Sequence, residues 1–356
     1  MPPVSVMIKP ASSACNLACE YCFYHSLADA RERGFRGIMT EETFSVIAKK
    51  ALEHADGADV FLSFQGGEPL LAGKKFFVSA FESIEKFNKK HSRVFIGVQT
   101  NGTLIDGEWC DIFAAERVLV GLSLDGDEKA NKFRVFQGGQ PTFDKISAAA
   151  EMLSARGAEF NILTVVTAPV AERIEEIYSF FKKRGFRYLQ YIPCLKPIGG
   201  GEGEYFLDGE AYGDFLIKAF NLYARDYFAD DYVSVRIFDN FVRLAGGRRA
   251  EQCGMNGHCT HQFVVESDGE VYPCDFFCAD GYSLGNILTS DFRELERSKR
   301  AEAFIKESLV KKNECKECAY YALCAGGCKR ERMSLDVCAA YKKFLSYALP
   351  VLRRMG

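Results

Sequence analysis

The sequence predicts an α/β fold in which six strand–helix units form a partial (β/α)6 barrel of the TIM type, followed by a cysteine-rich C-terminal domain. Over the first 195 residues, apolar runs of strand length alternate with amphipathic helical stretches. A Gly/Pro-rich break follows at residues 196–203, and from about residue 251 cysteines become dense. Six such units suit an open barrel better than a doubly wound sheet.

Each unit of the predicted barrel has its own strand and helix signals. The predicted strands are Val4–Lys9, Val60–Phe64, Val94–Thr100, Val118–Leu124, Phe160–Val166 and Tyr188–Ile192. The helices predicted between them are Glu41–His54, Lys74–Lys90, Gly107–Ala115, Thr142–Arg156 and Glu172–Arg184. Thr40 and Asp106 are suited to cap helix N-termini, and Gly157 and Gly185 to end helices.

The C-terminal part has fewer regular elements. Helices are predicted near Asp208–Phe228 and Tyr341–Arg354. Phe263–Glu266 and Glu270–Pro273 flank a Ser-Asp-Gly sequence, which predicts a tight hairpin. We therefore expect a barrel with a linker helix over residues 1–235, a cysteine-rich domain over residues 236–340 and a terminal helix over residues 341–356.

Composition excludes several classes of protein. The 356 residues are 48% hydrophobic and 26% charged, as in ordinary globular proteins. The net charge of −3 and the lack of a long basic run argue against nucleic-acid binding. We see no signal peptide and no apolar stretch of membrane-spanning length. Fourteen cysteines in a chain of this length indicate metal binding, so we expect a protein of the reducing cytoplasm.

Three cysteines follow the first predicted strand, at the barrel end where function is expected: Cys15-x3-Cys19-x2-Cys22. Three thiols can bind three irons of a 4Fe–4S cube, whereas an electron-carrying cluster normally has four cysteines. The fourth iron would keep an open position, as catalytic metal sites do. Zinc knuckles and chance spacing can imitate this pattern, so the spacing alone leaves both options open.

Polar residues at other strand ends add to this site. Tyr21 is an aromatic residue suited to lie against a flat adenine. The second strand ends in Gln65-Gly-Gly-Glu-Pro69, whose glycines permit close backbone approach to a ligand. Glu68 and nearby carbonyls can accept bonds from an ammonium group. Ser123-Leu-Asp-Gly126 offers polar groups at the same barrel face.

With these motifs the chain resembles the radical S-adenosylmethionine (SAM) superfamily. The resemblance implies that SAM chelates the open iron of the cluster through its amino and carboxylate groups. Reductive cleavage of SAM then yields a 5′-deoxyadenosyl radical that abstracts a substrate hydrogen, while the protein orients the cofactor and excludes water. The residues that this resemblance assigns to the cluster are Cys15, Cys19 and Cys22, and those assigned to the methionine moiety are Gly66, Gly67 and Glu68.

Eight further cysteines fall into two runs, Cys253-x5-Cys259-x14-Cys274 and Cys315-x2-Cys318-x5-Cys324-x3-Cys328-x9-Cys338. Eight thiols can complete two four-cysteine sites, for zinc or for iron–sulfur clusters. The layout resembles the SPASM extension of radical SAM peptide-modifying enzymes, which carries two auxiliary 4Fe–4S clusters. The resemblance assigns one cluster to Cys253, Cys259, Cys274 and Cys328, and the other to Cys315, Cys318, Cys324 and Cys338. Three clusters are expected in all.

Longer stretches of sequence resemble one particular family within this superfamily. They are Ile8-Lys-Pro-Ala-Ser-Ser, Tyr21-Cys-Phe-Tyr-His25, Phe64-Gln-Gly-Gly-Glu-Pro-Leu-Leu-Ala-Gly73, Gln99-Thr-Asn-Gly-Thr-Leu-Ile-Asp106 and Val271-Tyr-Pro-Cys-Asp-Phe276. They are similar to the anaerobic sulfatase-maturating enzymes over nearly the whole chain. Those enzymes oxidise a Cys or Ser of a sulfatase to Cα-formylglycine. The resemblance implies a sulfatase polypeptide or peptide with a C/S-x-P-x-R sequence as substrate, and flavodoxin or ferredoxin as electron donor.

The same resemblance implies residue roles. After loss of a Cβ hydrogen, the substrate radical must lose a proton and an electron, and the auxiliary clusters would accept the electron. Asp275 matches the family's catalytic aspartate and would be the base. Tyr24 and Gln65 match positions that line the target side chain. The remaining cofactor-side positions are Tyr21, Ser123, Arg134 and Leu195, of which Leu195 matches an apolar wall.

The sequence departs from the family pattern near Arg134, and two alternative functions remain open. Residues 127–133 form a stretch one residue shorter than the family pattern, and Ala130 replaces a usual histidine just before Arg134. A maturase that forms thioether or carbon–carbon crosslinks in a ribosomal peptide would share both cluster regions. A third hypothesis is a non-catalytic module that binds zinc or transfers electrons. Cys110 and Cys194 are predicted to be packed thiols, and the sequence leaves the choice between Cys and Ser substrates open.

Overall fold

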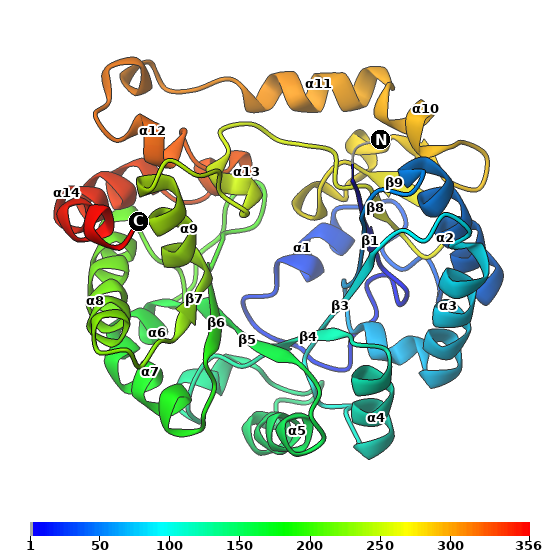
Figure 1. Ribbon diagram of the computed structural model, residues 1–356, viewed down its shortest axis with the longest axis horizontal. Helices are drawn as coiled ribbons and strands as arrows, with labels where there is room; N and C mark the ends of the chain where they lie inside the picture. The colour runs from blue at the N-terminus through cyan, green and yellow to red at the C-terminus, as the bar shows by residue number, and fades with distance from the viewer. Residues whose placement is uncertain (1–2) are drawn as a thin grey trace. The chain divides into compact units, whose positions relative to one another are not determined.

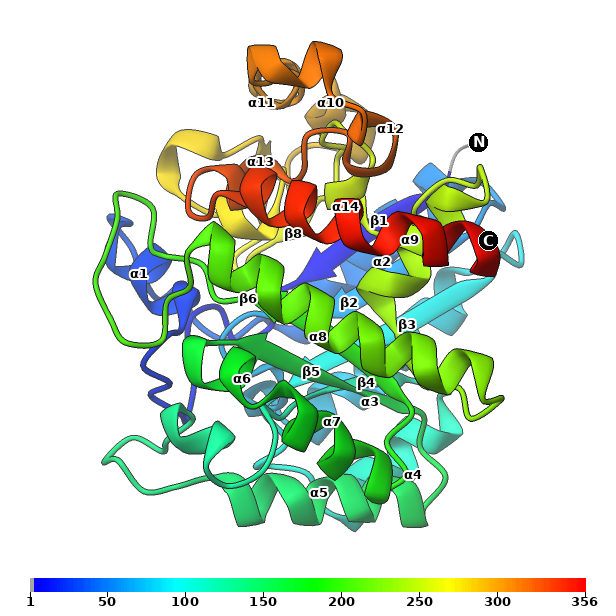
Figure 2. The same ribbon diagram turned by 90° about the vertical axis from the view of Figure 1, so that its left-hand side faces the viewer.

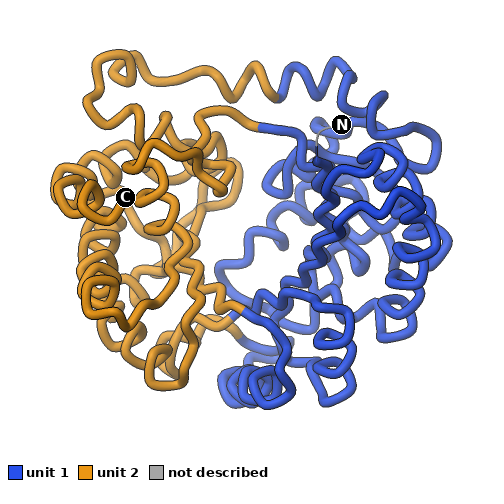
Figure 3. The backbone as a smooth tube through the Cα atoms, in the orientation of Figure 1, with its two compact units in different colours: residues 1–123, 135–160, 260–304 blue, residues 124–134, 161–259, 305–356 orange. Residues whose placement is uncertain are grey.

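The computed structural model describes residues 3–356; Met1 and Pro2, with which the first predicted domain begins, lie outside the described residues. The chain divides into two compact units, which Figure 3 distinguishes by colour and which are described one at a time. Unit 1 comprises Met1–Ser123, Val135–Phe160 and Thr260–Phe304. Unit 2 comprises Leu124–Arg134, Asn161–Cys259 and Ile305–Gly356. The domain boundaries expected from the sequence stay predictions.

The strands of unit 1 pair in the order β10-β9-β8-β1-β2-β3-β4 (Figure 1). Neighbouring strands from β1 to β4 run parallel, so that their carboxyl ends lie at one edge. The strands are β1 Val4–Ile8, β2 Val60–Phe64, β3 Val94–Thr100, β4 Leu119–Ser123, β8 Val264–Val265, β9 Glu270–Tyr272 and β10 Gly285–Asn286. Four predicted strands are therefore confirmed to within a residue at either end.

Helices of unit 1 follow its strands, and α2 packs beside α3 (Figure 1). Thr40 caps α2 by accepting a bond from Thr43 N, and Asp106 caps α4 in the same way from Trp109 N, so both predicted caps are confirmed. The helices are α1 Phe23–Asp29, α2 Glu41–Ala55, α3 Lys74–Phe87, α4 Gly107–Ala115, α5 Phe143–Ala155 and α10 Phe292–Glu296. Short 3-10 helices are η1 Pro69–Ala72, η4 Asp275–Phe277 and η5 Asp280–Tyr282.

The predicted hairpin is present and has an additional partner. Strands β8 and β9 pair antiparallel around a turn in which Gly269 has a φ of +86°. Strand β8 also pairs in parallel with β1, with Met7 opposite Val264 and Ile8 opposite Val265. The hairpin thereby extends the sheet next to the strand that precedes the first cysteine motif. The sequence did not predict this pairing.

Unit 2 has its own parallel strands, in the order β5-β6-β7. They are β5 Phe160–Val166, β6 Tyr188–Pro193 and β7 Ser234–Val235. Its helices are α6 Ala168–Glu172, α7 Ile174–Lys183, α8 Gly209–Phe228, α9 Arg236–Ala245, α12 Tyr321–Cys324, α13 Lys329–Arg332 and α14 Val337–Met355. Its 3-10 helices are η2 Ala130–Phe133, η3 Cys253–Met255 and η6 Asn313–Glu317, and α11 Lys299–Ser308 runs from unit 1 into unit 2.

The two long helices of unit 2, α8 and α14, lie side by side (Figure 2). Gly213 permits their close approach, because a Cβ there would lie 3.3 Å from Ala340 Cα. The closing helix begins at Val337, earlier than the predicted Tyr341, because the Asp336 side chain accepts a bond from Ala339 N and caps it. Cys338 consequently lies in the first turn of α14.

Some other helices also differ from the predictions. Helix α3 ends at Phe87 rather than Lys90, and the Asn88 side chain bonds the backbone of Ser92 beyond the helix end. The predicted helix over residues 172–184 is present as α7, to within two residues at either end, and the short helix α6, which Thr167 caps, precedes it and was not predicted. Helices α1 and α9 were not predicted, since each is short and follows no strong N-cap residue.

Candidate active site

The three cysteines of the first motif share one loop, between β1 and α1. Their side chains are partly exposed, and Cys22 N donates to Cys19 O at 3.1 Å. Burial raises the pKa of the Cys15 thiol to about 12, and the charges of Glu68, Cys19 and Cys22 act in the same direction. The three sulfurs are therefore close enough to influence one another. Thiols of this kind ionise when a cation such as cluster iron binds them.

A polar network of unit 1 holds the backbone of this loop. Asn101 Nδ2 donates to Asn16 Oδ1 at 2.9 Å, and Asn16 Nδ2 donates to Thr103 Oγ1 at 2.8 Å. Gln137 Nε2 donates to Cys15 O at 2.7 Å. No role was predicted for Asn16 or Gln137, although Asn101 and Thr103 belong to a string that carried the family resemblance.

The glycine pair after β2 lies against the same loop. Gly66 and Gly67 have φ values of +87° and +42°, which favour glycine. A Cβ at Gly67 would lie 2.1 Å from Ala14 O, and Glu68 N donates to Ala14 O at 2.7 Å. Only glycine permits this contact between the second strand end and the backbone just before Cys15.

The Glu68 carboxylate is completely buried and accepts three hydrogen bonds from protein groups. The donors are Leu70 N at 3.0 Å, Thr100 Oγ1 at 2.8 Å and Asn101 N at 2.8 Å. Burial raises the pKa of Glu68 to about 7 against the opposing effect of these bonds. The carboxylate thus ties the end of β2 to the end of β3, and its predicted contact with a methionine moiety stays a prediction.

The structure brings the three predicted catalytic side chains together. Asp275 begins η4 just after the hairpin, Tyr24 lies in the first turn of α1, and Gln65 follows β2. Tyr24 Oη donates to Asp275 Oδ2 at 2.5 Å, and Gln65 Nε2 lies 2.8 Å from Tyr24 Oη and 3.4 Å from Asp275 Oδ2. Burial raises the pKa of Tyr24 well above its usual value, and the charge of Asp275 adds to this effect. Tyr24 is therefore a hydrogen-bond donor to the carboxylate.

Lys9, which sequence reasoning missed, completes this group. Its Nζ lies 3.0 Å from Asp275 Oδ1 and 4.5 Å from the centre of the Tyr24 ring. Burial alone would lower the pKa of Lys9, but the charge of Asp275 and of neighbouring acidic groups outweighs burial and raises it. The sequence carried no signal for this role, because the burial of Lys9 and the position of its acidic partner are seen only in the structure.

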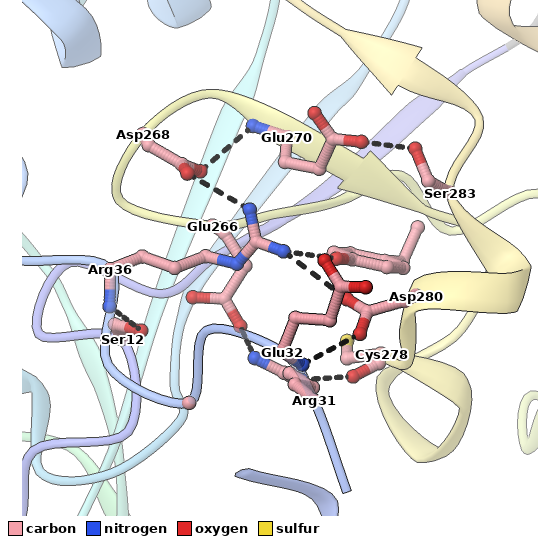
Figure 4. Close-up of polar contacts among 12 residues, drawn as sticks. Ser12, Arg31, Glu32, Arg36, Glu266, Asp268, Glu270, Cys278, Asp280 and Ser283 are labelled. Atoms are coloured by element: carbon pink, nitrogen blue, oxygen red, sulfur yellow. Dashed lines mark hydrogen bonds and ion pairs between the residues drawn. The ribbon is translucent and has the colours of Figure 1, made fainter.

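Two arginines after α1 fix the segment that carries Asp275 (Figure 4). Arg31 Nη1 lies 2.7 Å from Glu266 Oε1, and Arg31 Nε donates to Cys278 O directly after η4. Arg36 Nη1 donates to Asp268 Oδ2 at 2.9 Å in the hairpin turn. Because these arginines follow the helix of Tyr24, they link that helix to the segment of Asp275.

The other predicted cofactor-side residues are buried or partly buried. Tyr21 is buried, and Ser123 Oγ accepts a bond from Gln99 Nε2 at 3.0 Å. In unit 2, Arg134 Nε and Nη2 donate to the two carboxylate oxygens of Asp125 at 2.9 and 3.1 Å. Leu195 is buried after β6. The binding roles of these residues stay predictions.

Four C-terminal cysteines gather in unit 2. They line one cavity of about 390 Å³. Burial raises the pKa of Cys324, and the charges of the other three thiols act in the same direction. The four residues are Cys315, Cys318, Cys324 and Cys338. The structure therefore collects the complete thiol set predicted for the second auxiliary cluster.

The four cysteines predicted for the other auxiliary cluster do not all belong to one unit: three are in unit 2 and Cys274 is in unit 1. In unit 2, a Cβ at Gly254 would lie 3.1 Å from Cys328 Cβ, and burial raises the pKa of Cys328 to about 12, with Cys253 acting in the same direction. Cys259 N donates to Ser308 Oγ at 2.9 Å, also in unit 2. Completion of this set by Cys274 of unit 1 stays a prediction. The three remaining thiols are buried: Cys110, Cys194 and Cys278.

Two further properties concern the described residues as a whole. From residue 3 onward, no three His, Cys, Asp or Glu side chains are arranged to hold a single metal ion. A 4Fe–4S cube is held differently, by one thiolate on each ligated iron. No described helix is both long enough and apolar enough to pass through a membrane.

Two family models match parts of the chain that contain cysteine motifs. The model of the radical SAM superfamily matches residues 10–181, and the model of an iron–sulfur cluster-binding domain called SPASM matches residues 253–319. The fold and the site thus define a radical SAM enzyme with a C-terminal iron–sulfur domain.

Individual relatives show to which family of radical SAM enzymes the chain belongs. A cysteine-type anaerobic sulfatase-maturating enzyme of Clostridium perfringens is 44% identical over 99% of this chain and 98% of its own length. A serine-type enzyme of Bacteroides thetaiotaomicron is 29% identical over 98% of this chain and 90% of its own. The solved structure of native anSMEcpe with bound AdoMet and Cp18Cys peptide has a TM-score of 0.94 at 41% identity, covering 99% and 98% of the two chains. The chain belongs to the family of anaerobic sulfatase-maturating enzymes, and the predicted fold class is confirmed.

Proposed function

We propose that this enzyme oxidises a cysteine of a sulfatase, within a C-x-P-x-R sequence, to Cα-formylglycine. The observation that carries the proposal is the Tyr24–Gln65–Asp275 group, which places a buried carboxylate in the same unit as the Cys15–Cys19–Cys22 loop. Cysteine is favoured over serine as the target because the cysteine-type relatives share more of this sequence than the serine-type ones.

Three 4Fe–4S clusters and SAM are the proposed cofactors. The partly exposed thiols of the first loop and the four thiols that line one cavity of unit 2 are suited to hold two of the clusters. When bound, these groups supply the radical that removes one Cβ hydrogen and the acceptor for one electron. An external donor such as flavodoxin or ferredoxin would reduce the first cluster. Oxygen-sensitive clusters and free thiols fit a reducing compartment such as the cytoplasm.

The residues of the first unit orient the cofactor in this proposal. Gly67 brings the backbone after β2 against Ala14, just before the first cysteine, and Gly66 and Gly67 would contact the methionine moiety of SAM. Glu68 keeps this segment joined to the end of β3 through its bonds to Thr100 and Asn101. Tyr21 and Ser123 of this unit are further proposed contacts of the cofactor, and for Arg134 and Leu195 the same role is inferred from the family resemblance alone.

Asp275 is the proposed proton acceptor. A target –CH2–SH that has lost one Cβ hydrogen atom would become –CH=S by losing its thiol proton to Asp275 and one electron to the acceptor that the C-terminal cysteines would hold. Water then replaces the sulfur, releasing hydrogen sulfide and leaving the aldehyde. The ion pair with Lys9 holds Oδ1 of Asp275, and Tyr24 and Gln65 hold its Oδ2.

An anaerobic assay with two peptides tests the proposal. Reconstituted enzyme, SAM and a chemical reductant are mixed with peptides that differ only in Cys or Ser at the target position. We expect the Cys peptide to give an aldehyde together with an equal amount of 5′-deoxyadenosine. Cleavage of SAM without oxidation of either peptide would contradict the proposal. A thioether or carbon–carbon ring in the product would instead identify a maturase of ribosomal peptides.

A further inference from the structure

We propose that Lys9 is a positioning residue for Asp275: its buried ammonium fixes one carboxylate oxygen so that the other faces Tyr24 and Gln65. The inference rests on the proposed function, because it takes Asp275 as the acceptor of the substrate proton. It adds a residue of the first strand to the machinery that removes this proton.

The two oxygens of the Asp275 carboxylate have different partners. Lys9 Nζ lies 3.0 Å from Oδ1, whereas Tyr24 Oη at 2.5 Å and Gln65 Nε2 at 3.4 Å approach Oδ2. The Lys9 and Asp275 side chains are only 2% and 8% exposed, so bulk water competes little for either group. An ion pair on one oxygen and hydrogen bonds on the other oppose rotation of the carboxylate.

The fold holds Lys9 from its backbone to its ammonium group. Lys9 directly follows β1, and its N–H donates to Val265 O of β8 at 2.9 Å, in the hairpin that leads to Asp275. Its side chain then passes Gly66, where a Cβ would lie 2.7 Å from Lys9 Cγ and 2.9 Å from Cδ. The first glycine of the motif therefore also leaves the space that the lysine occupies. The ammonium ends 4.5 Å from the centre of the Tyr24 ring.

Asp275 forms a direct ion pair with Lys9, whereas the other buried carboxylate nearby is paired with an arginine. The other buried carboxylate that acts on Lys9 is that of Glu266, which lies 2.7 Å from Arg31. Arg31 also bonds the carbonyl of Cys278 and thus has a separate structural role in the same region. Each of the two buried carboxylates accordingly has its own cation.

Loss of the Lys9 ammonium should uncouple the two halves of the reaction. The hydrogen abstraction comes before the step that needs Asp275, so SAM cleavage continues in a Lys9 variant. Removal of the proton slows, because a carboxylate released at Oδ1 no longer presents Oδ2 to the substrate in one orientation. A lysine that served only general stability would reduce both products together.

The test uses the full-length reconstituted enzyme as wild type, K9M, K9R, D275N and K9M/D275N, with SAM and the Cys peptide. Aldehyde and 5′-deoxyadenosine are both quantified. We expect K9M to lower aldehyde formation by about tenfold or more, a loss of the size that misplacing a proton acceptor causes, with 5′-deoxyadenosine changed less than about threefold. K9R should recover much of the coupling, and K9M should cause no further loss in the D275N background.

Lys50 supplies a matched control. Its Nζ donates to the carbonyls of Ile287 and Ser290 at 2.6 and 2.9 Å, so K50M also removes a partly buried ammonium from unit 1. K50M should keep the wild-type ratio of aldehyde to 5′-deoxyadenosine. A wild-type ratio in K9M, or losses that multiply in K9M/D275N, would overturn the inference.

Thermal unfolding of the same variants gives a readout that does not depend on activity. Leaving one member of a buried ion pair alone is worse than removing both, so K9M should unfold at a lower temperature than K9M/D275N. A double variant that is less stable than both single variants would contradict the ion pair. If the wild type forms no aldehyde, the proposed function fails, and this unfolding cycle still tests whether Lys9 holds Asp275.

Discussion

Tyr24 and Asp275 are 251 residues apart in the sequence, and the Tyr24 hydroxyl donates a 2.5 Å hydrogen bond to Asp275 Oδ2. Tyr24 comes two residues after Cys22, whereas Asp275 follows the hairpin of β8 and β9. The two meet because β8 pairs with β1, the strand that leads into the cysteine loop. Pairing of distant strands thus assembles the first cysteine loop and the proposed base in a single unit.

Replacing Asp275 by Asn should separate SAM cleavage from product formation. The amide cannot accept the substrate proton, so aldehyde formation should fall by roughly 100-fold or more, while 5′-deoxyadenosine formation changes little. Quantifying both by mass spectrometry checks this. Asp280→Asn, at a partly exposed carboxylate of the same segment, should keep the wild-type ratio. An unchanged aldehyde yield in Asp275→Asn would remove the residue from its role.

Tyr24→Phe should weaken the same step less severely. The variant keeps the ring and loses only the hydroxyl that donates to Asp275, so we expect an aldehyde yield lower by about tenfold. Tyr178→Phe in unit 2 is the control, because Tyr178 Oη donates to buried Asp226 at 3.0 Å. The control should lose stability and keep the product ratio. Equal product ratios in the two variants would argue against a role for the Tyr24 hydroxyl.

Gly66→Ala should be more damaging than Gly73→Ala. Both glycines have a φ near +85°, so alanine costs about 1 kcal/mol in backbone strain at either position. At Gly66 the Cβ would also lie 2.7 Å from Lys9 Cγ, whereas at Gly73 it would meet nothing within 4 Å. We expect the additional clash to cost roughly 1–3 kcal/mol and to weaken SAM binding. Similar unfolding midpoints and SAM affinities in the two variants would show that the Lys9 contact is unimportant.

Glu68 should make stability depend on pH. Burial raises the pKa of Glu68 from an ordinary 4.5 to about 7, so between these values the folded chain binds more protons than the unfolded chain. Its contribution to stability is therefore complete below pH 4.5 and is lost as pH rises through 7, by roughly 3 kcal/mol at most. The unfolding midpoint of the wild type, measured from pH 5 to 8, should fall with pH relative to that of Glu68→Gln. The control is Glu128→Gln, at an exposed glutamate, whose unfolding midpoint should depend on pH as that of the wild type does. If the unfolding midpoints of the wild type and of Glu68→Gln changed with pH in parallel, the raised pKa of Glu68 would be contradicted.

Local signals explain what the sequence predicted well. The caps Thr40 and Asp106, the turn at Gly269 and the strands of the first units depend on residues close in sequence, and the structure contains them. The four-cysteine set of the cavity was likewise readable from spacing combined with family resemblance.

Long-range pairing explains what was missed. The partner of β8 depends on which edge of the sheet is free, which no local pattern specifies. Lys9 and Arg31 look like ordinary surface residues in the sequence, and only the position of Asp275 and Glu266 shows why they are buried. The burial of a lysine or arginine cannot be predicted from the sequence until the position of its acidic partner is known.

Electron paramagnetic resonance of the reduced enzyme tests most directly whether the Cys15–Cys19–Cys22 cluster keeps an iron open to SAM. We predict that added SAM alters the signal of one cluster, and that C15A/C19A/C22A loses this response together with about four of about twelve irons per chain. A signal that is indifferent to SAM, from a protein whose iron content shows every cluster to be present, would contradict the open iron site.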